Sequence, residues 1–280
     1  QEELCEIAAH NFPILNLNHI NIKNEDGVTY LQVMSPVDCL FLDPARRNEH
    51  GGKTVAISDC EPNVAELEGL LLSKANRIMI KLSPMLDLSQ ALKELPHTQE
   101  VHIISVNNEC KELLLLLGQT APEEIPVHCV NLSTKGEQEK QLFVFTREQE
   151  QHSECSYTDT LGNYLYEPNA SLLKAGAFRS IAAAYSAKKL HPNSHLYTSD
   201  TQIEGFPGRT FRIINRCSLN KKEIKENLSD LKKANITVRN FPATVAELRK
   251  RIKLAEGGDT YLFASTLNDG QKILIRCGKV

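Results

Sequence analysis

Short apolar runs alternate with segments of helical spacing from Gln1 to about Arg147, and this alternation constrains the fold more than any other feature of the sequence. Strands that alternate with helices are typical of parallel sheets, in which crossover helices join one strand to the next. The runs that predict strands are Val37–Leu42 and Ile78–Leu82, both expected to be buried, and Val101–Val106 and Val127–Leu132. We therefore expect this part of the chain to fold as an α/β sheet.

Local signals predict the elements between these runs. Asn63 and Glu66 have the spacing of a capping box, and Asp87 is placed to cap a short helix. The other elements that we expect are a helix over residues 4–12, a strand over Ile20–Ile22, a helix over Glu109–Leu117 and a strand over Gln141–Phe145. Helices would thus accompany the strands throughout the first 150 residues or so.

The C-terminal part predicts a smaller unit with a different order of elements. Residues 148–163 are rich in Glu, Gln, Ser and Thr, which is typical of a linker, and Asn169–Lys189 is an Ala-rich helical segment. From about Gly205 the expected order is β-α-β-α-β-β. Its elements are a strand over Thr210–Ile214, a basic helix over Lys221–Ala234, a strand over Ile236–Arg239, a helix begun by Thr244 and Glu247, and a hairpin of Tyr261–Thr266 with Lys272–Cys277. We predict domains at 1–150 and 205–280, with 151–204 as a linker that contains a helix.

Charge is distributed very unevenly along the chain. Residues 1–204 carry 16 Lys or Arg against 28 Asp or Glu, a net charge of −12, whereas residues 205–280 carry 16 against 7, a net charge of +9. Such an asymmetry suggests that the basic part faces a polyanion. A solvated basic face is the alternative. We favour nucleic acid as the partner because the cations gather on identifiable elements.

Composition excludes several classes of protein. The longest apolar run, Leu113–Leu117, is far too short to cross a bilayer, so we expect no membrane partner. The chain begins with Gln1 and shows no signal peptide, and we expect it to be part of a longer cytoplasmic protein. Its eight cysteines form no C-x-x-C pair, and no histidine belongs to an H-E-x-x-H pattern, so we expect reduced thiols and no metal. The oligomeric state is not predicted.

A candidate site follows the first buried strand directly. The sequence after Leu42 is Asp43-Pro44-Ala45-Arg46-Arg47, and ligands of open α/β sheets bind just beyond the carboxyl ends of the strands. A carboxylate at Asp43 can accept a hydrogen bond from an amino or hydroxyl group, while Pro44 fixes the backbone beside it. A simple turn after a strand is the alternative for this pair, and surface ion pairs are the alternative for the two arginines.

These residues resemble a known family. The Asp-Pro pair is similar to motif IV of class I S-adenosylmethionine-dependent methyltransferases, and Glu25-Asp26-Gly27 is similar to their acidic turn beside the cofactor adenine. Towards the C-terminus, Gly208-Arg209-Thr210-Phe211 and Gly257-Gly258-Asp259 resemble a THUMP-like module. The whole series resembles methyltransferases of the Bacteroidetes type that end in a THUMP-like domain.

The resemblance implies a fold and an activity. The expected fold is a partial Rossmann-like methyltransferase sheet plus a small C-terminal α+β THUMP-like domain, and the expected activity is transfer of a methyl group from S-adenosylmethionine to an RNA nucleobase. Asp43, Pro44 and Arg46 would be the catalytic residues, and Asp26 with Asp43 would contact the cofactor. A solvated acid or a helix cap is the alternative for Asp26.

The chain also departs from the family pattern. Ala45 and Arg46 stand where amino-methylating members carry a second proline and an aromatic ring, so a guanidinium of Arg46 or Arg47 would hold the target base instead. The sequence contains no G-x-G, and the glycine loop of the family would lie before Gln1. We therefore expect this chain alone to bind S-adenosylmethionine poorly.

Cations of the basic part are the candidate RNA contacts. We predict that RNA is bound by Arg209, Arg239, Arg249, Lys250, Arg251 and Lys253, with Lys221, Lys222, Lys225, Lys232 and Lys233 adding a second cationic helix. For the cluster at 249–253, interaction with the helix dipole is the alternative. A non-catalytic RNA-binding or scaffolding protein is the alternative function, and a protein-interaction module without RNA is a third possibility.

Overall fold

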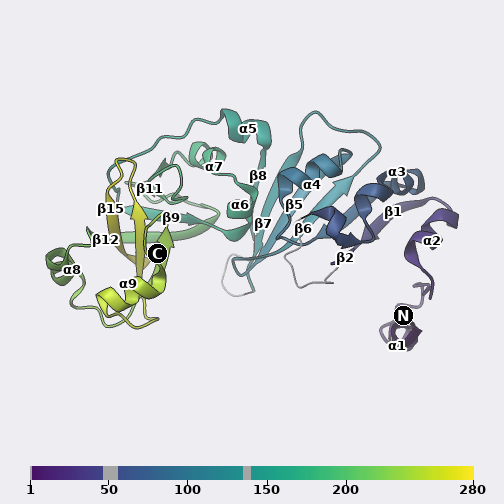
Figure 1. The fold of residues 1–280 in the computed structure, drawn as a ribbon, viewed down its shortest axis with the longest axis horizontal. Coiled ribbons are helices and arrows are strands. Elements are labelled where there is room, and N and C mark those ends of the chain that lie inside the picture. The colour runs from purple at the N-terminus through teal and green to yellow at the C-terminus, as the bar shows by residue number, and fades with distance from the viewer. Residues whose placement is uncertain (1, 47–55, 135–139) are drawn as a thin grey trace. The chain divides into compact units, whose positions relative to one another are not determined.

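The computed structural model describes residues 2–46, 56–134 and 140–280, which form two compact units (Figure 1). The first unit comprises Gln1–Lys81, Met85–His97 and Leu116–Ala121. The second comprises Leu82–Pro84, Thr98–Leu115 and Pro122–Val280. The chain is thus a mixed α/β protein, as the alternation of apolar runs and helical segments predicts.

The first unit contains a parallel strand pair, as the alternation of strands and helices predicts. Its elements are α1 (Glu2–Ile14), α2 (Gly27–Val33), β1 (Val37–Leu42), β2 (Ala45–Arg46), η1 (Ile57–Asp59), β3 (Cys60–Glu61), α3 (Val64–Lys74), β4 (Ala75–Leu82) and α4 (Leu88–Glu94). Strand β1 runs parallel to β4, with Leu42 opposite Ile80, and α3 lies between the two strands in the sequence. Asn63 caps α3 and Asp87 caps α4, as their positions predict.

Two predictions for this unit are wrong. Ile20–Ile22 forms no strand, because a three-residue segment without a pairing neighbour among the described strands gains no ladder hydrogen bonds. Strand β1 exists but is not buried: the side chain of Phe41 is 60% exposed, and Val37 is exposed as well. In the described part of the chain, β4 is the neighbour of β1. An apolar run predicts a strand, but it does not say what covers that strand.

The second unit begins with four strands of a mixed sheet. These are β5 (Thr98–Val106), β6 (Glu109–Leu117), β7 (Pro126–Leu132) and β8 (Lys140–Thr146), and they are neighbours in the order β6-β5-β7-β8. Strand β5 is parallel to β7, and β7 is antiparallel to β8. Figure 1 shows these strands side by side in the teal part of the chain.

The helix predicted over Glu109–Leu117 is wrong, since this segment is strand β6. Asn107 and Asn108, which precede it, have φ values of 50° and 65°, and two such residues form the tight turn of a β-hairpin. Within the leucine run, Leu113, Leu115 and Leu117 are buried and the residues between them are less so. That period of two belongs to a strand, and an unbroken run of leucines conceals it.

A seven-stranded sheet forms the rest of the second unit. Its order is β10-β11-β9-β12-β15-β14-β13. The strands are β9 (Tyr164–Pro168), β10 (Lys188–Lys189), β11 (Tyr197–Ser199), β12 (Gly208–Cys217), β13 (Asn235–Arg239), β14 (Thr260–Thr266) and β15 (Lys272–Lys279), and the helices are α5 (Arg147–His152), α6 (Ala170–Ala175), α7 (Arg179–Ala184), α8 (Lys221–Leu228) and α9 (Val245–Ile252). From β12 onwards the order β-α-β-α-β-β is confirmed, including the capping box of α9 and the final hairpin.

Two helices of this part are shorter than predicted. The Ala-rich segment forms α6 and α7 because Gly176, at a φ of 77°, ends α6 in the left-handed conformation that glycine adopts at low cost. Helix α8 ends at Leu228, so that Lys232 and Lys233 lie beyond it. The predicted second cationic helix therefore carries Lys221, Lys222 and Lys225 only.

The seven-stranded sheet is buried on both faces. Phe263, Ile273 and Ile275 belong to one apolar cluster, in which the rings of Phe211 and Phe263 meet edge to face at 4.9 Å. Alternate residues of the same strands, such as Leu262 and Leu274, belong to a second cluster that includes side chains of α8 and α9. This alternation fixes the register of the strands, because a shift by one residue would exchange the two faces.

All eight cysteines lie in described residues and are free thiols. Burial raises the pKa of the Cys217 thiol to about 11 and that of the Cys277 thiol to about 12, so both stay protonated at neutral pH. None of the helices in the described residues combines the length and the apolar character that a membrane crossing needs.

Candidate functional site

A cavity of about 670 Å³ opens in the first unit at the carboxyl end of β1. It lies among α2, β1, β3 and α3, and its lining includes Asp26, Tyr30, Phe41, Asp43, Pro44 and Asn63. Pockets for small molecules and cofactors have volumes of this order, with mostly apolar walls and a few polar groups. The structure thus brings three of the predicted site residues, Asp26, Asp43 and Pro44, to one cavity.

Asp43 forms an ion pair that the sequence analysis did not foresee. Its carboxylate oxygen Oδ2 lies 2.6 Å from Nζ of Lys81, at the end of β4. Because Leu42 is opposite Ile80 in the parallel pair, the residues that follow them emerge at the same edge of the sheet. Lys81 fixes the carboxylate at the edge of the cavity, and only the register of β1 with β4 shows that the two residues are neighbours.

Asp26 has a structural task as well as a place in the cavity. Its Oδ1 accepts hydrogen bonds from the backbone nitrogen of Thr29 at 2.8 Å and from the hydroxyl of Thr29 at 2.9 Å, so that it caps α2. The backbone hydrogen bond from Thr29 is the main cause of a lowered pKa for Asp26. The helix cap considered as an alternative is present, and the same residue lines the cavity.

The arginines after Asp43 are only partly described. The backbone of Arg46 lies in β2 and pairs with Cys60 in β3, while Ala45 pairs with Glu61. The side chain of Arg46, and Arg47 as a whole, lie outside the described residues. The cavity is lined from this side by Glu61, Pro62 and Asn63. The sequence does not predict this, because these residues are distant from Asp43 along the chain.

The predicted RNA contacts on α9 divide into two kinds. Arg249 donates a hydrogen bond from Nη1 to the carbonyl of Ala234 at 3.2 Å, and Arg251 donates one from Nη2 to the carbonyl of Leu219 at 2.8 Å. These guanidinium groups hold α9 to the neighbouring segments. Lys250 and Lys253 are exposed, and Lys253 ends the helix at a φ of 62°.

Arg209 and Arg239 share one buried carboxylate. Glu167, in β9, has a side chain that is only 2% exposed. Both the Nε (2.9 Å) and the Nη2 of Arg209 donate to its Oε2, and Nη2 of Arg239 donates to Oε1 at 2.9 Å. The two guanidinium groups remain about a third exposed, at 37% and 35%. They are therefore fixed in position and still reachable from solvent.

A second cavity, of about 550 Å³, lies in the second unit, and its lining includes Arg209 and several amide side chains. Asn131 Oδ1 accepts from the hydroxyl of Ser105 at 2.8 Å, and Gln141 Oε1 accepts from Nδ2 of Asn169 at 3.0 Å. Gln141 Nε2 in turn donates to the carbonyl of Gly208 at 3.1 Å. This network joins β5, β7 and β8 to the seven-stranded sheet and gives the side-chain amides of Asn131, Gln141 and Asn169 partners in the protein.

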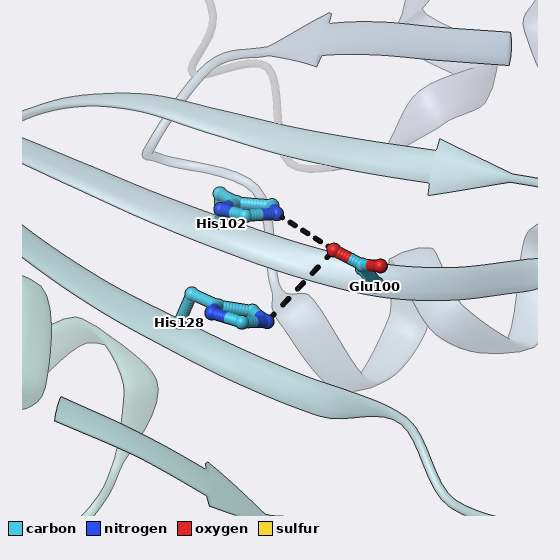
Figure 2. A group of neighbouring side chains, drawn as sticks. All are labelled: Glu100, His102 and His128. Carbon is cyan, nitrogen blue, oxygen red and sulfur yellow. Dashed lines mark hydrogen bonds and ion pairs between the residues drawn. The ribbon is translucent and has the colours of Figure 1, made fainter.

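One group of potential metal ligands stands on β5 and β7 (Figure 2). Oε2 of Glu100 lies 3.1 Å from Nε2 of His102 and 3.8 Å from Nε2 of His128. The two imidazole rings are stacked, with centroids 4.4 Å apart and planes inclined by 8°. Burial, followed by the neighbouring His102, lowers the pKa of His128. The sequence motifs predict no metal site, and this group forms because β5 pairs with β7 in a register that places His102 beside His128.

Comparisons with known proteins identify the segments and the family. Residues 164–207 match a family described as a ferredoxin-like domain, and residues 208–279 match one described as THUMP domain-like. The chain is 39% identical to a crystal structure described as a putative methyltransferase from Porphyromonas gingivalis W83, with a TM-score of 0.90 over 100% of this chain and 70% of that chain. Comparison with curated proteins finds no match.

An identity of 39% over the whole of this chain is far above what a shared fold alone produces, and the THUMP-like match covers the basic part. The chain therefore belongs to the family of methyltransferases that carry a THUMP-like domain, as the motifs around Asp43 and Gly208 predict. The α/β fold class with a THUMP-like C-terminal part is confirmed as well.

Proposed function

We propose that this chain is part of an S-adenosylmethionine-dependent methyltransferase that methylates a nucleobase of RNA in the cytoplasm. The observation that carries the proposal is the position of Asp43-Pro44, which follows β1 and lines a cavity of about 670 Å³. The chain that holds this cavity belongs to a methyltransferase family. Methyl transfer from a sulfonium is an in-line displacement, so that the protein mainly positions the acceptor and stabilises its developing charge.

The residues of this cavity suit part of the cofactor. Apolar walls from Leu31 and Phe41 suit a flat ring, and the carboxylates of Asp26 and Asp43 suit hydroxyl or amino groups. No G-x-G occurs in the 280 residues, and the backbone of such a loop is what normally lets the cofactor approach closely. The fit is therefore incomplete, and we expect this chain alone to bind S-adenosylmethionine weakly.

Each residue at the edge of the cavity has a proposed task, and the bound cofactor would supply the methyl group. Asp43 accepts a hydrogen bond from the amino or hydroxyl group of the acceptor, and Lys81 holds the carboxylate in place through the 2.6 Å ion pair. Pro44 fixes the backbone at the end of β1. Arg46 is proposed to hold the target base, since a guanidinium plane stacks on rings as an aromatic side chain does.

The basic C-terminal part is proposed to bind the RNA backbone. Residues 205–280 have a net charge of +9 and match the THUMP-like family. Exposed Lys250 and Lys253 are the simplest phosphate contacts, because no hydrogen bond to protein commits their ammonium groups in the described residues. Arg209 and Arg239 are fixed by Glu167 at a defined spacing, which favours a site for a particular backbone shape.

The test is incorporation of labelled methyl groups into RNA by the protein at its natural length. We expect methylated RNA and RNA retention that weakens steeply with salt. Retention without incorporation would contradict the enzymatic proposal and support the alternative, a non-catalytic RNA-binding or scaffolding protein. The absence of both would contradict the RNA partner too.

A further inference from the structure

We propose that Glu100, His102 and His128 form a binding site for a divalent transition-metal ion of the zinc class. The site lies on β5 and β7 of the second unit, and it does not depend on methyl transfer. Two imidazole nitrogens and one carboxylate oxygen are the ligand set that zinc takes in sites with an open fourth position.

Strand register places the three ligands together. His102 and His128 are direct partners in the parallel pair of β5 and β7, so that their side chains leave the sheet on the same face. Glu100 lies two residues before His102 and therefore points to that face as well. Figure 2 shows both imidazole rings with a nitrogen turned toward the Glu100 carboxylate.

The distances suit a shared ion. With metal–ligand bonds of about 2.0–2.1 Å, two ligands of a tetrahedral ion lie about 3.3 Å apart. The two distances from Glu100 Oε2, 3.1 Å and 3.8 Å, lie on either side of that value. All three ligand atoms lie within 4.8 Å of one another, so small rotations of the side chains would complete the site.

Exposure and chemistry favour a metal over a simple hydrogen bond. One oxygen of Glu100 faces two stacked imidazoles. A hydrogen bond between a carboxylate and a histidine needs only one imidazole, whereas a shared metal ion would use both. The side chains of His102 and His128 are 27% and 25% exposed, which leaves a path for an ion and for water as a fourth ligand. Imidazole ligands select zinc, cobalt, nickel and copper over magnesium and calcium, which prefer oxygen.

The test is a titration of the complete 280-residue chain, first freed of metal by a chelator. Zinc binding is measured by calorimetry, and cobalt binding by its visible spectrum, which distinguishes imidazole from thiolate ligands and so separates this site from the eight free cysteines. We expect one equivalent of ion per chain, with a spectrum of nitrogen and oxygen ligands. His102→Ala and His128→Ala should each weaken binding by at least about tenfold.

Two further variants keep the result decisive. Glu100→Gln preserves the shape of the side chain and should also weaken binding, which tests the site even where a histidine variant fails to fold. His152→Ala is the matched control, because the His152 ring bonds the carbonyl of Glu148 in its own helix at 3.0 Å and belongs to no group of potential metal ligands in the described residues. Binding that is unchanged in all three site variants, or a cobalt spectrum dominated by thiolate, would overturn the proposal.

Discussion

Replacing the buried Glu167 carboxylate should lower the stability of the second unit more than replacing any exposed charged side chain does. In Glu167→Gln the side chain keeps its size but loses the charge that holds Arg209 and Arg239. Its amide can accept from one guanidinium only through its single oxygen and offers N–H groups to the other. Two cations would then face each other across a side chain that is 2% exposed.

The magnitude follows from burial and from the exposure of the partners. Breaking a buried ion pair by removing one partner costs about 3–5 kcal/mol. Because the two guanidinium groups are about a third exposed, water recovers part of that loss, and we expect a decrease of about 2–3 kcal/mol in the free energy of unfolding. Cation–π contacts of Arg209 with Phe211, at 5.4 Å, and Tyr261, at 5.9 Å, keep that arginine in place in the variant.

The assay is urea unfolding followed by far-ultraviolet circular dichroism, since the sequence contains no tryptophan. A loss of about 2–3 kcal/mol corresponds to a midpoint lower by about 1 M or more in urea. Glu204→Gln is the matched control, because Glu204 is exposed in the same unit. A loss of less than about 0.5 kcal/mol in Glu167→Gln, the range of ordinary surface changes, would refute the reasoning.

Three further predictions concern packing, RNA and pH. In the same urea assay, Gly208→Ala should lower the free energy of unfolding by about 1–3 kcal/mol, because a Cβ there would meet the carbonyl of Glu167. Gly69 is exposed in α3 with nothing near it, so Gly69→Ala should raise the free energy of unfolding by about 0.5–1 kcal/mol. Lys250→Gln should lower the salt slope of RNA binding by about 1 in filter binding, and an exposed lysine of the first unit replaced in the same way should leave it unchanged. A backbone hydrogen bond at the start of α9 is the main cause of the lowered pKa of Glu247. The stability that the Glu247 carboxylate contributes is therefore present above its unfolded pKa, near 4.5, and disappears as the pH falls through the lower folded value. Glu247→Gln has no carboxylate to protonate and should lose less stability on acid titration than the unchanged protein does. An equal loss of stability in the two proteins would contradict this.

Local signals predicted elements well where the cause is local. The cap of α9 at Thr244 and the final hairpin depend on side chains within a few residues of each other, and both form as predicted. The sequence predicts a helix where strand β6 forms, because a run of leucines has no period of its own and the deciding turn at Asn107-Asn108 lies outside it. The prediction that β1 is buried is also wrong, since burial depends on segments far away in the sequence.

The candidate sites show the same division. Asp43 could be predicted because it follows its strand directly, and the structure places it at a cavity. Lys81 and the pair of His102 with His128 depend on which strands are neighbours and in which register, and a single sequence does not contain that information. Glu167 is a similar case, because its two arginines come from 42 and 72 residues further along the chain.

The comparison of Asp43→Asn with Asp38→Asn tests the central claim most directly, because Asp38 lies in β1 and Asp43 directly follows it, and of the two Asp43 alone lines the cavity. The measurement is the content of methylated nucleosides, by mass spectrometry, in RNA incubated with S-adenosylmethionine and the protein at its natural length. We predict a loss of at least about a hundredfold in methylation rate for Asp43→Asn, the usual scale of a positioned proton acceptor, and an unchanged rate for Asp38→Asn. Equal rates in the two variants would contradict the account.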